Sequence, residues 1–135
     1  MSFKKNIIYN QDCEKILESL PDGCIDLMVQ DLPYGVTKNS WDVVPDLERM
    51  WKHWLRVGKE NCAFVFTTQQ PFTTDVIFSQ RKLFRQEIIW HKIGGAGDFL
   101  NAKKRILKRH ENILVFYKKL PVYNPQMVEG KPNHS

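Results

Sequence analysis

The sequence predicts an α/β fold: an open sheet, flanked by helices, that ends in a β-hairpin. Short apolar runs rich in β-branched and aromatic residues alternate along the chain with stretches whose apolar residues recur at helical spacing. At 135 residues the chain is long enough for one modest core, so these elements form one domain or part of one. The alternation favours a doubly wound, largely parallel sheet.

The first elements are a short strand at 6–10 and a helix at 13–20. Asp12 is suited to be the N-cap of this helix, because its carboxylate can accept hydrogen bonds from the free N–H groups of the first turn. Residues 21–23 (Pro-Asp-Gly) form a turn signal. The apolar run 25–30 that follows is predicted to be a buried strand.

The next elements continue the alternation. A helix is expected at 45–57, where large apolar residues recur every three or four positions, a stripe typical of packing on a sheet. A second buried strand is predicted at 61–68, followed by a helix at 71–79 that has proline in its first turn. Strands at 84–90 and 111–118 complete the sheet, the last in a terminal hairpin.

Composition limits the function classes. The chain has 20 Lys and Arg against 15 Asp and Glu, a formal net charge of +5, which fits a polyanionic partner. The three cysteines lack the paired spacing of a zinc site, and His110 with Glu111 has no third ligand, so no metal is assigned. Since the sequence has no signal peptide or membrane-length apolar run, we expect a cytoplasmic protein with reduced thiols and no membrane partner.

The segment Asp31-Leu32-Pro33-Tyr34-Gly35 carries the functional signal. It places a carboxylate at the carboxyl end of a predicted strand, where open α/β sheets bind their ligands. Pro33 restricts Leu32 to an extended conformation, and Tyr34 offers a flat ring with a polar tip. A negative acceptor, an oriented carbonyl and an aromatic ring together suit a planar ring that bears an amino group.

Asp-Leu-Pro-Tyr resembles the Asp-Pro-Pro-Tyr catalytic loop of DNA methyltransferases that modify the exocyclic amino group of adenine or cytosine. Other segments stand in the order found in phage- and prophage-type adenine methyltransferases of the permuted (beta-type) class, which begins with the catalytic half. They are 10–13, 35–42, 99–104, 110–117 and 123–127. The resemblance covers nearly the whole chain. It departs at Leu32, where the family has proline; the chemistry needs only a backbone carbonyl there, so we expect the change to be tolerated.

The resemblance implies a partial Rossmann-like methyltransferase sheet. It also implies a site-specific methyltransferase that uses S-adenosylmethionine to methylate the N6 amino group of a flipped adenine in double-stranded DNA, as in phage or restriction-modification systems. Two alternatives stay open. The same loop chemistry serves methylation of cytosine at N4, and the chain could be a non-catalytic DNA-binding remnant.

The resemblance also assigns roles to residues. Asp31 and the Leu32 carbonyl would accept the two amino hydrogens, Pro33 would shape the loop, and Tyr34 would stack on the base. Asp12, with Asp31, would lie near the adenosyl end of the methyl donor; a helix cap alone is the competing interpretation of Asp12.

DNA contacts are expected from two places. Trp41 either lines the base pocket, clamps the DNA backbone or covers the loop on the core. The run 103–109 carries five basic residues and no acidic one, which suits backbone phosphates, although a solvated basic face is the alternative. These five are Lys103, Lys104, Arg105, Lys108 and Arg109. The glycine-dense stretch 94–97 lacks the spacing of a phosphate-binding loop and is interpreted as a flexible loop near the site.

One expected segment does not occur in the sequence. The permuted enzymes bind the cofactor mainly through a later Phe-x-Gly-x-Gly turn, so this chain resembles their catalytic half alone, with 1–119 as that half and 120–135 as the start of a target-recognition region or a tail. Three explanations fit the absence of this segment: a truncated gene product, an artificially shortened fragment and a split enzyme. A second chain would complete the split enzyme, and a homodimer is the alternative assembly. We therefore expect the chain alone to bind S-adenosylmethionine weakly or not at all.

Overall fold

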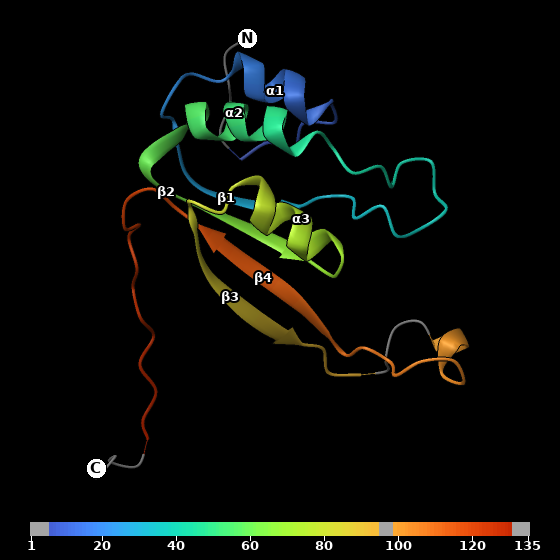
Figure 1. Ribbon diagram of the computed structural model, residues 1–135. Helices are drawn as coiled ribbons and strands as arrows, with labels where there is room; N and C mark the ends of the chain where they lie inside the picture. Colours follow the sequence, from blue (N-terminus) through green and yellow to red (C-terminus); the bar gives the residue numbers. More distant parts are fainter. Residues whose placement is uncertain (1–5, 95–98, 131–135) are drawn as a thin grey trace.

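The computed structural model describes residues 6–94 and 99–130 (Figure 1). The elements in chain order are α1 (Cys13–Ser19), β1 (Ile25–Asp31), α2 (Leu47–Val57), β2 (Gly58–Thr68), α3 (Phe72–Ser79), β3 (Phe84–His91), the 3-10 turn η1 (Phe99–Asn101) and β4 (His110–Phe116). The four strands form one sheet in the order β1-β2-β4-β3. Of the glycine-dense loop, residues 95–97 lie outside the described residues.

The pairing of the strands corrects one expectation and confirms another. β1 and β2 are parallel, but β4 pairs antiparallel with both β2 and β3, so the largely parallel sheet was wrong. Since β2 and β3 both oppose β4, they point the same way, as the strand–helix alternation predicted. β4 returns from β3 as the second strand of a hairpin and takes the place between β2 and β3. The terminal hairpin is confirmed.

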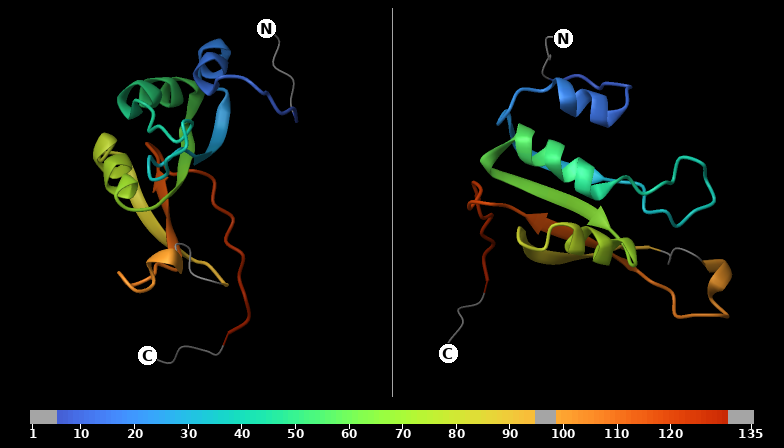
Figure 2. Two further views of the ribbon diagram at one scale, coloured as in Figure 1. Left: turned by 90° about the vertical axis from the view of Figure 1, so that its right-hand side faces the viewer. Right: turned by 45° about the horizontal axis from the view of Figure 1, so that its top comes forward.

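The core lies between the sheet and the helices α2 and α3, which pack on the same face (Figure 2). The apolar stripe of α2 is confirmed as packing. Trp51 and Trp54 are buried, and Trp51 lies against Phe66 of β2 and Phe116 of β4 with ring centroids 5.4 Å and 5.2 Å away. Such tilted aromatic pairs add about 0.5–1.5 kcal/mol each beyond the apolar area that they bury.

The opposite face of the sheet is not covered by any helix of the described residues (Figure 2). In β1 only Met28 is buried, whereas Leu27 and Val29 are 56% and 68% exposed, so the prediction of a fully buried strand was wrong. The predicted strand at 6–10 is also absent from the described residues; Ile8 there is 97% exposed. Apolar residues predicted both elements, but burial requires a second layer, which the described residues 6–94 and 99–130 do not form.

Two local features fix the helices. Asp12 caps α1 as predicted, its carboxylate accepting from the N–H groups of Glu14 (2.9 Å) and Lys15 (3.3 Å). α2 passes into β2 without a loop at Gly58, where a Cβ atom would lie 2.9 Å from the Phe64 ring, so only glycine fits. None of the described helices is long and apolar enough to cross a membrane.

Candidate active site and nucleic-acid surface

The candidate site lies where the parallel strands β1 and β2 end. Their register pairs Asp31, the last residue of β1, with Thr67 near the end of β2. Asp31 is exposed, and it lines a cavity of about 410 Å³ together with the loop that follows β1. A carboxylate at the carboxyl end of a strand, open to a cavity, is accessible to a ligand.

A compact hydrogen-bond network orients the Asp31 carboxylate. The Thr67 hydroxyl donates to Asp31 Oδ1 at 2.7 Å, and the Tyr34 hydroxyl lies 3.0 Å from the same oxygen and 3.2 Å from Thr67 Oγ1. Both contacts fall on one oxygen, and Asp31 Oδ2 has no hydrogen-bond partner in the described part of the chain. Sequence reasoning missed Thr67, whose only signal was its place near the end of the neighbouring strand.

Tyr34 is held as a hydrogen-bond donor. Burial of its ring is the main cause that raises the pKa of the hydroxyl to about 12, and the neighbouring Asp31 carboxylate raises it further, while the hydrogen bond with Thr67 lowers it. The phenol is therefore protonated at neutral pH. Its ring stacks on Phe72 of α3, with centroids 5.4 Å apart and planes inclined by 25°.

Leu32 and Pro33 join Asp31 to Tyr34 and also line the cavity. The Leu32 side chain packs against the core cluster, as does part of Tyr34. The side chain at this position thus has a packing role, and the backbone remains at the cavity.

The loop after Tyr34 is shaped by Gly35 and Asp42. Gly35 has φ +68°, a left-handed conformation that side chains rarely adopt, and a Cβ atom there would lie 3.0 Å from Val44. The buried Asp42 carboxylate accepts from the N–H groups of Gly35 (2.8 Å) and Thr37 (2.6 Å). One side chain therefore ties both ends of a tight loop, a role that the sequence did not reveal.

This loop also sets the charge of Asp42. The hydrogen bond from the Thr37 hydroxyl, together with the loop N–H groups, holds the pKa of the carboxyl below its ordinary value of 3.8, against the opposing effect of burial. The carboxylate is ionised at neutral pH and binds the loop through charge-assisted hydrogen bonds.

Trp41 lines the same cavity as Asp31 and is 70% exposed. The interpretation in which it covers the loop on the core is therefore wrong. The neighbouring Asp42, by contrast, is buried and holds the loop through its hydrogen bonds to Gly35 and Thr37.

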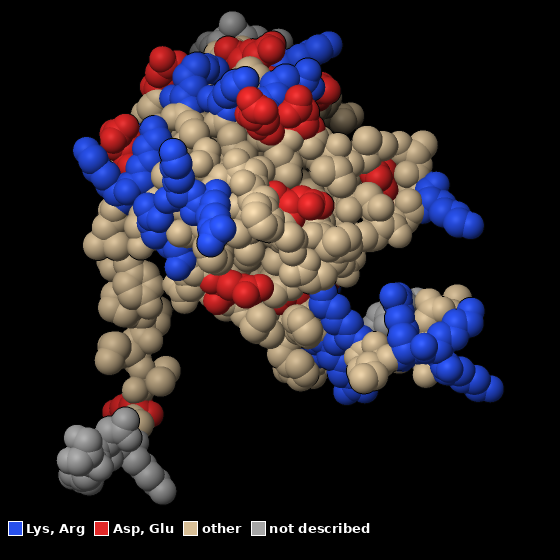
Figure 3. Space-filling model, in the orientation of Figure 1, with Lys and Arg blue, Asp and Glu red and all other residues tan. Residues whose placement is uncertain are grey.

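The predicted basic run lies on an arm that joins β3 to β4 and projects beyond the sheet (Figure 1). Lys and Arg gather on this arm in Figure 3, across an open gap from the loop that follows β1. Residues 105–111 of the arm line a second cavity of about 840 Å³ with Gly35, Val36 and residues 69–71. Among the cationic side chains that line this cavity, that of Lys92 forms an ion pair with Glu111. The structure thus brings the basic run beside the candidate active site.

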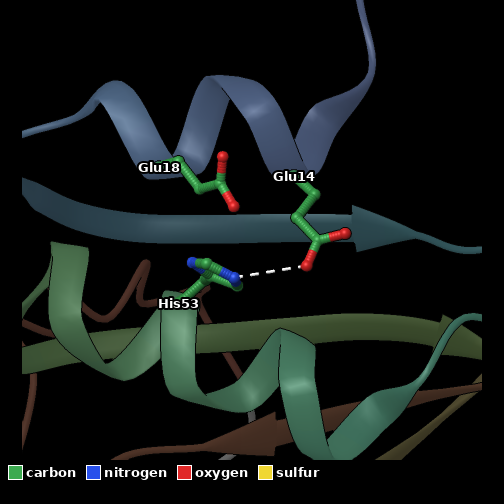
Figure 4. Close-up of side chains that lie close together, drawn as sticks. All are labelled: Glu14, Glu18 and His53. Carbon is green, nitrogen blue, oxygen red and sulfur yellow. Dashed lines mark ion pairs between the residues drawn. The ribbon is translucent and has the colours of Figure 1, made fainter.

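Asp12 does not join the Asp31 network, although α1 begins on the side of the molecule where β1 ends (Figure 1). Nearby, Glu14 and Glu18 of α1 face His53 of α2, their ligand atoms lying within 4.8 Å of one another (Figure 4). Glu14 pairs with His53 at 3.3 Å and with Arg49 at 2.8 Å. We interpret this group as an ion-pair cluster that holds α1 on α2.

No family model matches the chain. M1.MboII of Moraxella bovis, a type II methyltransferase, is 25% identical over 123 residues that cover 84% of this chain and 46% of M1.MboII. M.BglII of Bacillus subtilis, also a type II methyltransferase, is 31% identical over 133 residues that cover 84% of this chain and 35% of M.BglII. This chain thus spans less than half the length of these relatives.

Solved structures share the fold. M1.HpyAVI in its complex with SAM superposes with a TM-score of 0.65 at 18% identity, covering 91% of this chain and 61% of that chain. The cytosine-N4-specific PvuII DNA methyltransferase superposes with a TM-score of 0.62 at 16% identity, covering 84% and 49%. The α/β fold predicted from the sequence is therefore confirmed, since solved methyltransferases share it. Over 84% of its length this chain is similar in sequence to a part of two type II methyltransferases.

Proposed function

We propose that this chain is the catalytic part of a DNA methyltransferase that transfers a methyl group from S-adenosylmethionine to the N6 amino group of an adenine in double-stranded DNA. The observation that carries the proposal is the exposed Asp31 carboxylate, held at the cavity by Thr67 and Tyr34. Homology to type II methyltransferases supports the reaction class.

Two acceptors would activate the amino group. Its lone pair is delocalised into the ring, and hydrogen bonds accepted from both amino hydrogens favour the form in which that lone pair can attack. Asp31 Oδ2, which has no partner among the described residues, and the Leu32 carbonyl are the acceptors. A hydrogen bond to a charged group contributes about 1.5–3 kcal/mol.

Tyr34 would support the base. The amino group is out of reach inside a duplex, so the adenine must flip out. One face of the Tyr34 ring lies on Phe72, and the ring lines the cavity, so a flipped base would stack on its other side. Stacking on an aromatic ring contributes about 1–3 kcal/mol per base. Pro33 keeps the loop rigid between the two acceptors and the ring.

The cofactor, S-adenosylmethionine, supplies an activated methyl group when it is bound. Asp31 and Asp12 are the residues we assign to it: both carboxylates are exposed, and Asp12 would lie near the adenosyl end of the cofactor, as the resemblance implies. Asp12 already accepts two N–H groups of α1 and keeps a second oxygen for a ligand. The Phe-x-Gly-x-Gly turn through which the permuted enzymes mainly bind the cofactor does not occur in this sequence.

DNA would lie against the arm and the loop of Trp41. Lys103, Lys104, Arg105, Lys108 and Arg109 would neutralise backbone phosphates, and Trp41 would contact the flipped nucleotide or the strand beside it. Residues 1–119 would form the catalytic half, and 120–135 would begin the target-recognition region. The DNA substrate implies a bacterial cytoplasmic setting, as in restriction-modification.

Methylation of cytosine at N4 is the second candidate. The same pair of acceptors would activate the amino group of cytosine, and the structural similarity to a cytosine-N4-specific enzyme supports this candidate. A DNA-binding remnant without activity is the third.

The experiment uses the chain in its native host, where every partner is present. We expect deletion of the gene to remove one modified DNA motif from the methylome, read as N6-methyladenine by single-molecule sequencing. Wild-type chain restores the motif, and Asp31→Ala does not. Detection of N4-methylcytosine at the motif would instead assign methylation of cytosine at N4 to this chain. A methylome that deletion of the gene does not change would contradict the proposal and would favour the third candidate, a DNA-binding remnant without activity.

A further inference from the structure

Gln69 lies where the two cavities of the site meet. It follows β2 directly, and it lines both the cavity of Asp31 and the cavity beside the basic arm. We call these the Asp31 cavity and the arm cavity. Among the described residues, Val36 is the one other residue that lines both. A base in the Asp31 cavity and the strand that carries it in the arm cavity would therefore both lie next to Gln69.

The side-chain amide of Gln69 is available to a ligand. Neither its N–H groups nor its oxygen bonds to another group in the described part of the chain. By contrast, the Tyr34 hydroxyl and the Asp42 carboxylate, which line the same cavity, are already engaged in hydrogen bonds. Gln69 is half-buried, and an amide in such a place is stabilised by a ligand that supplies its missing partner.

The backbone holds Gln69 in a fixed place relative to Asp31. β1 and β2 stay paired up to Asp31 and Thr67, two residues before Gln69. On the other side, the Gln69 carbonyl accepts a hydrogen bond from the N–H group of Thr73 in the first turn of α3, at 3.0 Å. A residue fixed between a strand and a helix can position a ligand more precisely than a residue on a loop.

The chemistry of the bases indicates what the amide would bind. A flipped base is read through hydrogen bonds to its Watson–Crick edge. In adenine and in cytosine, the amino group on this edge stands beside a ring nitrogen that accepts a hydrogen bond, N1 in adenine and N3 in cytosine. Thymine and guanine present a carbonyl oxygen and a ring N–H at the same places. A donor beside two acceptors therefore matches adenine and cytosine alone.

We infer that Gln69 is a specificity-determining residue of this site. Its side-chain N–H donates to the ring nitrogen, while Asp31 and the Leu32 carbonyl accept the amino hydrogens. The inference rests on the proposed function, because it requires the base in the Asp31 cavity. The three groups together accept adenine or cytosine and reject thymine and guanine, so Gln69 does not choose between the two methylation reactions.

The test measures binding of single-stranded oligonucleotides to the full chain by fluorescence anisotropy. The probe is a short labelled thymidine strand with one central adenine, whose unpaired base needs no flipping. A second probe carries 1-deazaadenine, which keeps the amino group and the ring area but lacks the acceptor N1. A third carries 7-deazaadenine, which keeps N1 and serves as the control.

We expect the wild type to bind the adenine probe about fivefold more tightly than the 1-deazaadenine probe, the effect of one neutral hydrogen bond. Gln69→Leu should bind both probes equally. Gln70→Leu is the matched control and should keep the wild-type difference. Of the two cavities Gln70 lines the arm cavity alone, and its amide oxygen already accepts from the Thr74 hydroxyl at 2.8 Å. The 7-deazaadenine probe should bind each protein as the adenine probe does.

Two outcomes would overturn the inference: equal affinity of the wild type for the adenine and 1-deazaadenine probes, or a difference that persists in Gln69→Leu. Thermal melts establish that this variant is folded. Gln69→Glu, which has a similar shape and no donor, is the second variant and should also lose the difference.

Binding is scored without cofactor and without methyl transfer, which separates this inference from the proposed function. Discrimination by Gln69 in a chain whose deletion leaves the methylome unchanged would contradict the proposed function alone. Methylation of a DNA motif by a chain that binds the two probes equally would contradict the role of Gln69 alone.

Discussion

At the scale of single residues, the site depends on side chains that orient other side chains. Thr67 and Tyr34 fix one oxygen of Asp31 and leave the other without a partner among the described residues. Asp42 performs the corresponding task for the loop backbone. Neither Thr67 nor Asp42 belongs to the Asp-Leu-Pro-Tyr segment, so the chemistry of that segment depends on residues from elsewhere in the chain.

The first prediction concerns Thr67. Thr67→Val keeps the shape of the side chain but removes the donor to Asp31. We therefore expect the rate of methyl transfer by the complete enzyme to fall about tenfold. This is the lower end of the free-energy contribution of a charge-assisted hydrogen bond, because Asp31 is exposed. Thr67→Ser retains the hydroxyl and should retain most of the rate. Initial rates of methyl incorporation measure both. Equal rates for the valine and serine variants would contradict a positioning role.

The second prediction concerns Asp42 and pH. Its pKa is lower in the folded chain than in the unfolded chain, so the unfolded chain takes up the proton more readily and stability rises with pH across that interval. The contribution is complete above about the ordinary value of 3.8 and is lost as pH falls through the lower, folded value.

Thermal melts of wild type and Asp42→Asn between pH 7 and pH 3 test this. We expect the wild type to melt higher at pH 7, because the variant loses one acceptor of the loop N–H groups, and the difference to shrink below about pH 4. A difference that stays constant over the whole range would show that the charge of Asp42 does not stabilise the loop.

At the scale of elements, the strands set the site and the arm between β3 and β4 brings cations to it. The hairpin places residues 105–111 along the cavity that Gly35 and Val36 also line. Positive charge close to the catalytic loop suits a polyanion.

The third prediction follows for the arm. Replacing Lys103 and Lys104 by alanine should weaken duplex DNA binding equally for all sequences and reduce the slope of log affinity against log salt by about one for each lysine. Fluorescence anisotropy with a labelled duplex at several salt concentrations measures the slope. Lys52→Ala, an exposed lysine on α2, is the control and should not change it. An unchanged slope for the double variant would indicate a solvated basic face.

At the scale of the whole molecule, the two faces of the sheet differ. Helices α2 and α3 cover one face of the sheet, while among the described residues the opposite face has no helix on it and the outer edges of β1 and β3 have no strand partner.

The fourth prediction belongs to this scale. The sequence has no Phe-x-Gly-x-Gly turn of the kind that the permuted enzymes use for the cofactor, and Asp12 and Asp31 are the only residues assigned to it, so the chain alone should bind S-adenosylmethionine weakly or not at all. Isothermal titration calorimetry should detect no binding in the micromolar range. Micromolar affinity of the isolated chain would mean that it holds the cofactor without the rest of a methyltransferase.

The sequence by itself determined the features that depend on neighbours along the chain. Helix periodicity and the Asp12 cap predicted α1 and α2, and the segment from Asp31 to Tyr34 indicated the candidate site, because caps, turns and loop chemistry are local. The tertiary structure decided the rest. The insertion of β4 between β2 and β3, the approach of Thr67 to Asp31 and the exposure of Val29 all depend on segments far apart in the sequence. Apolar strands predict that a surface of the sheet is buried, but only packing in three dimensions decides which residues cover that surface.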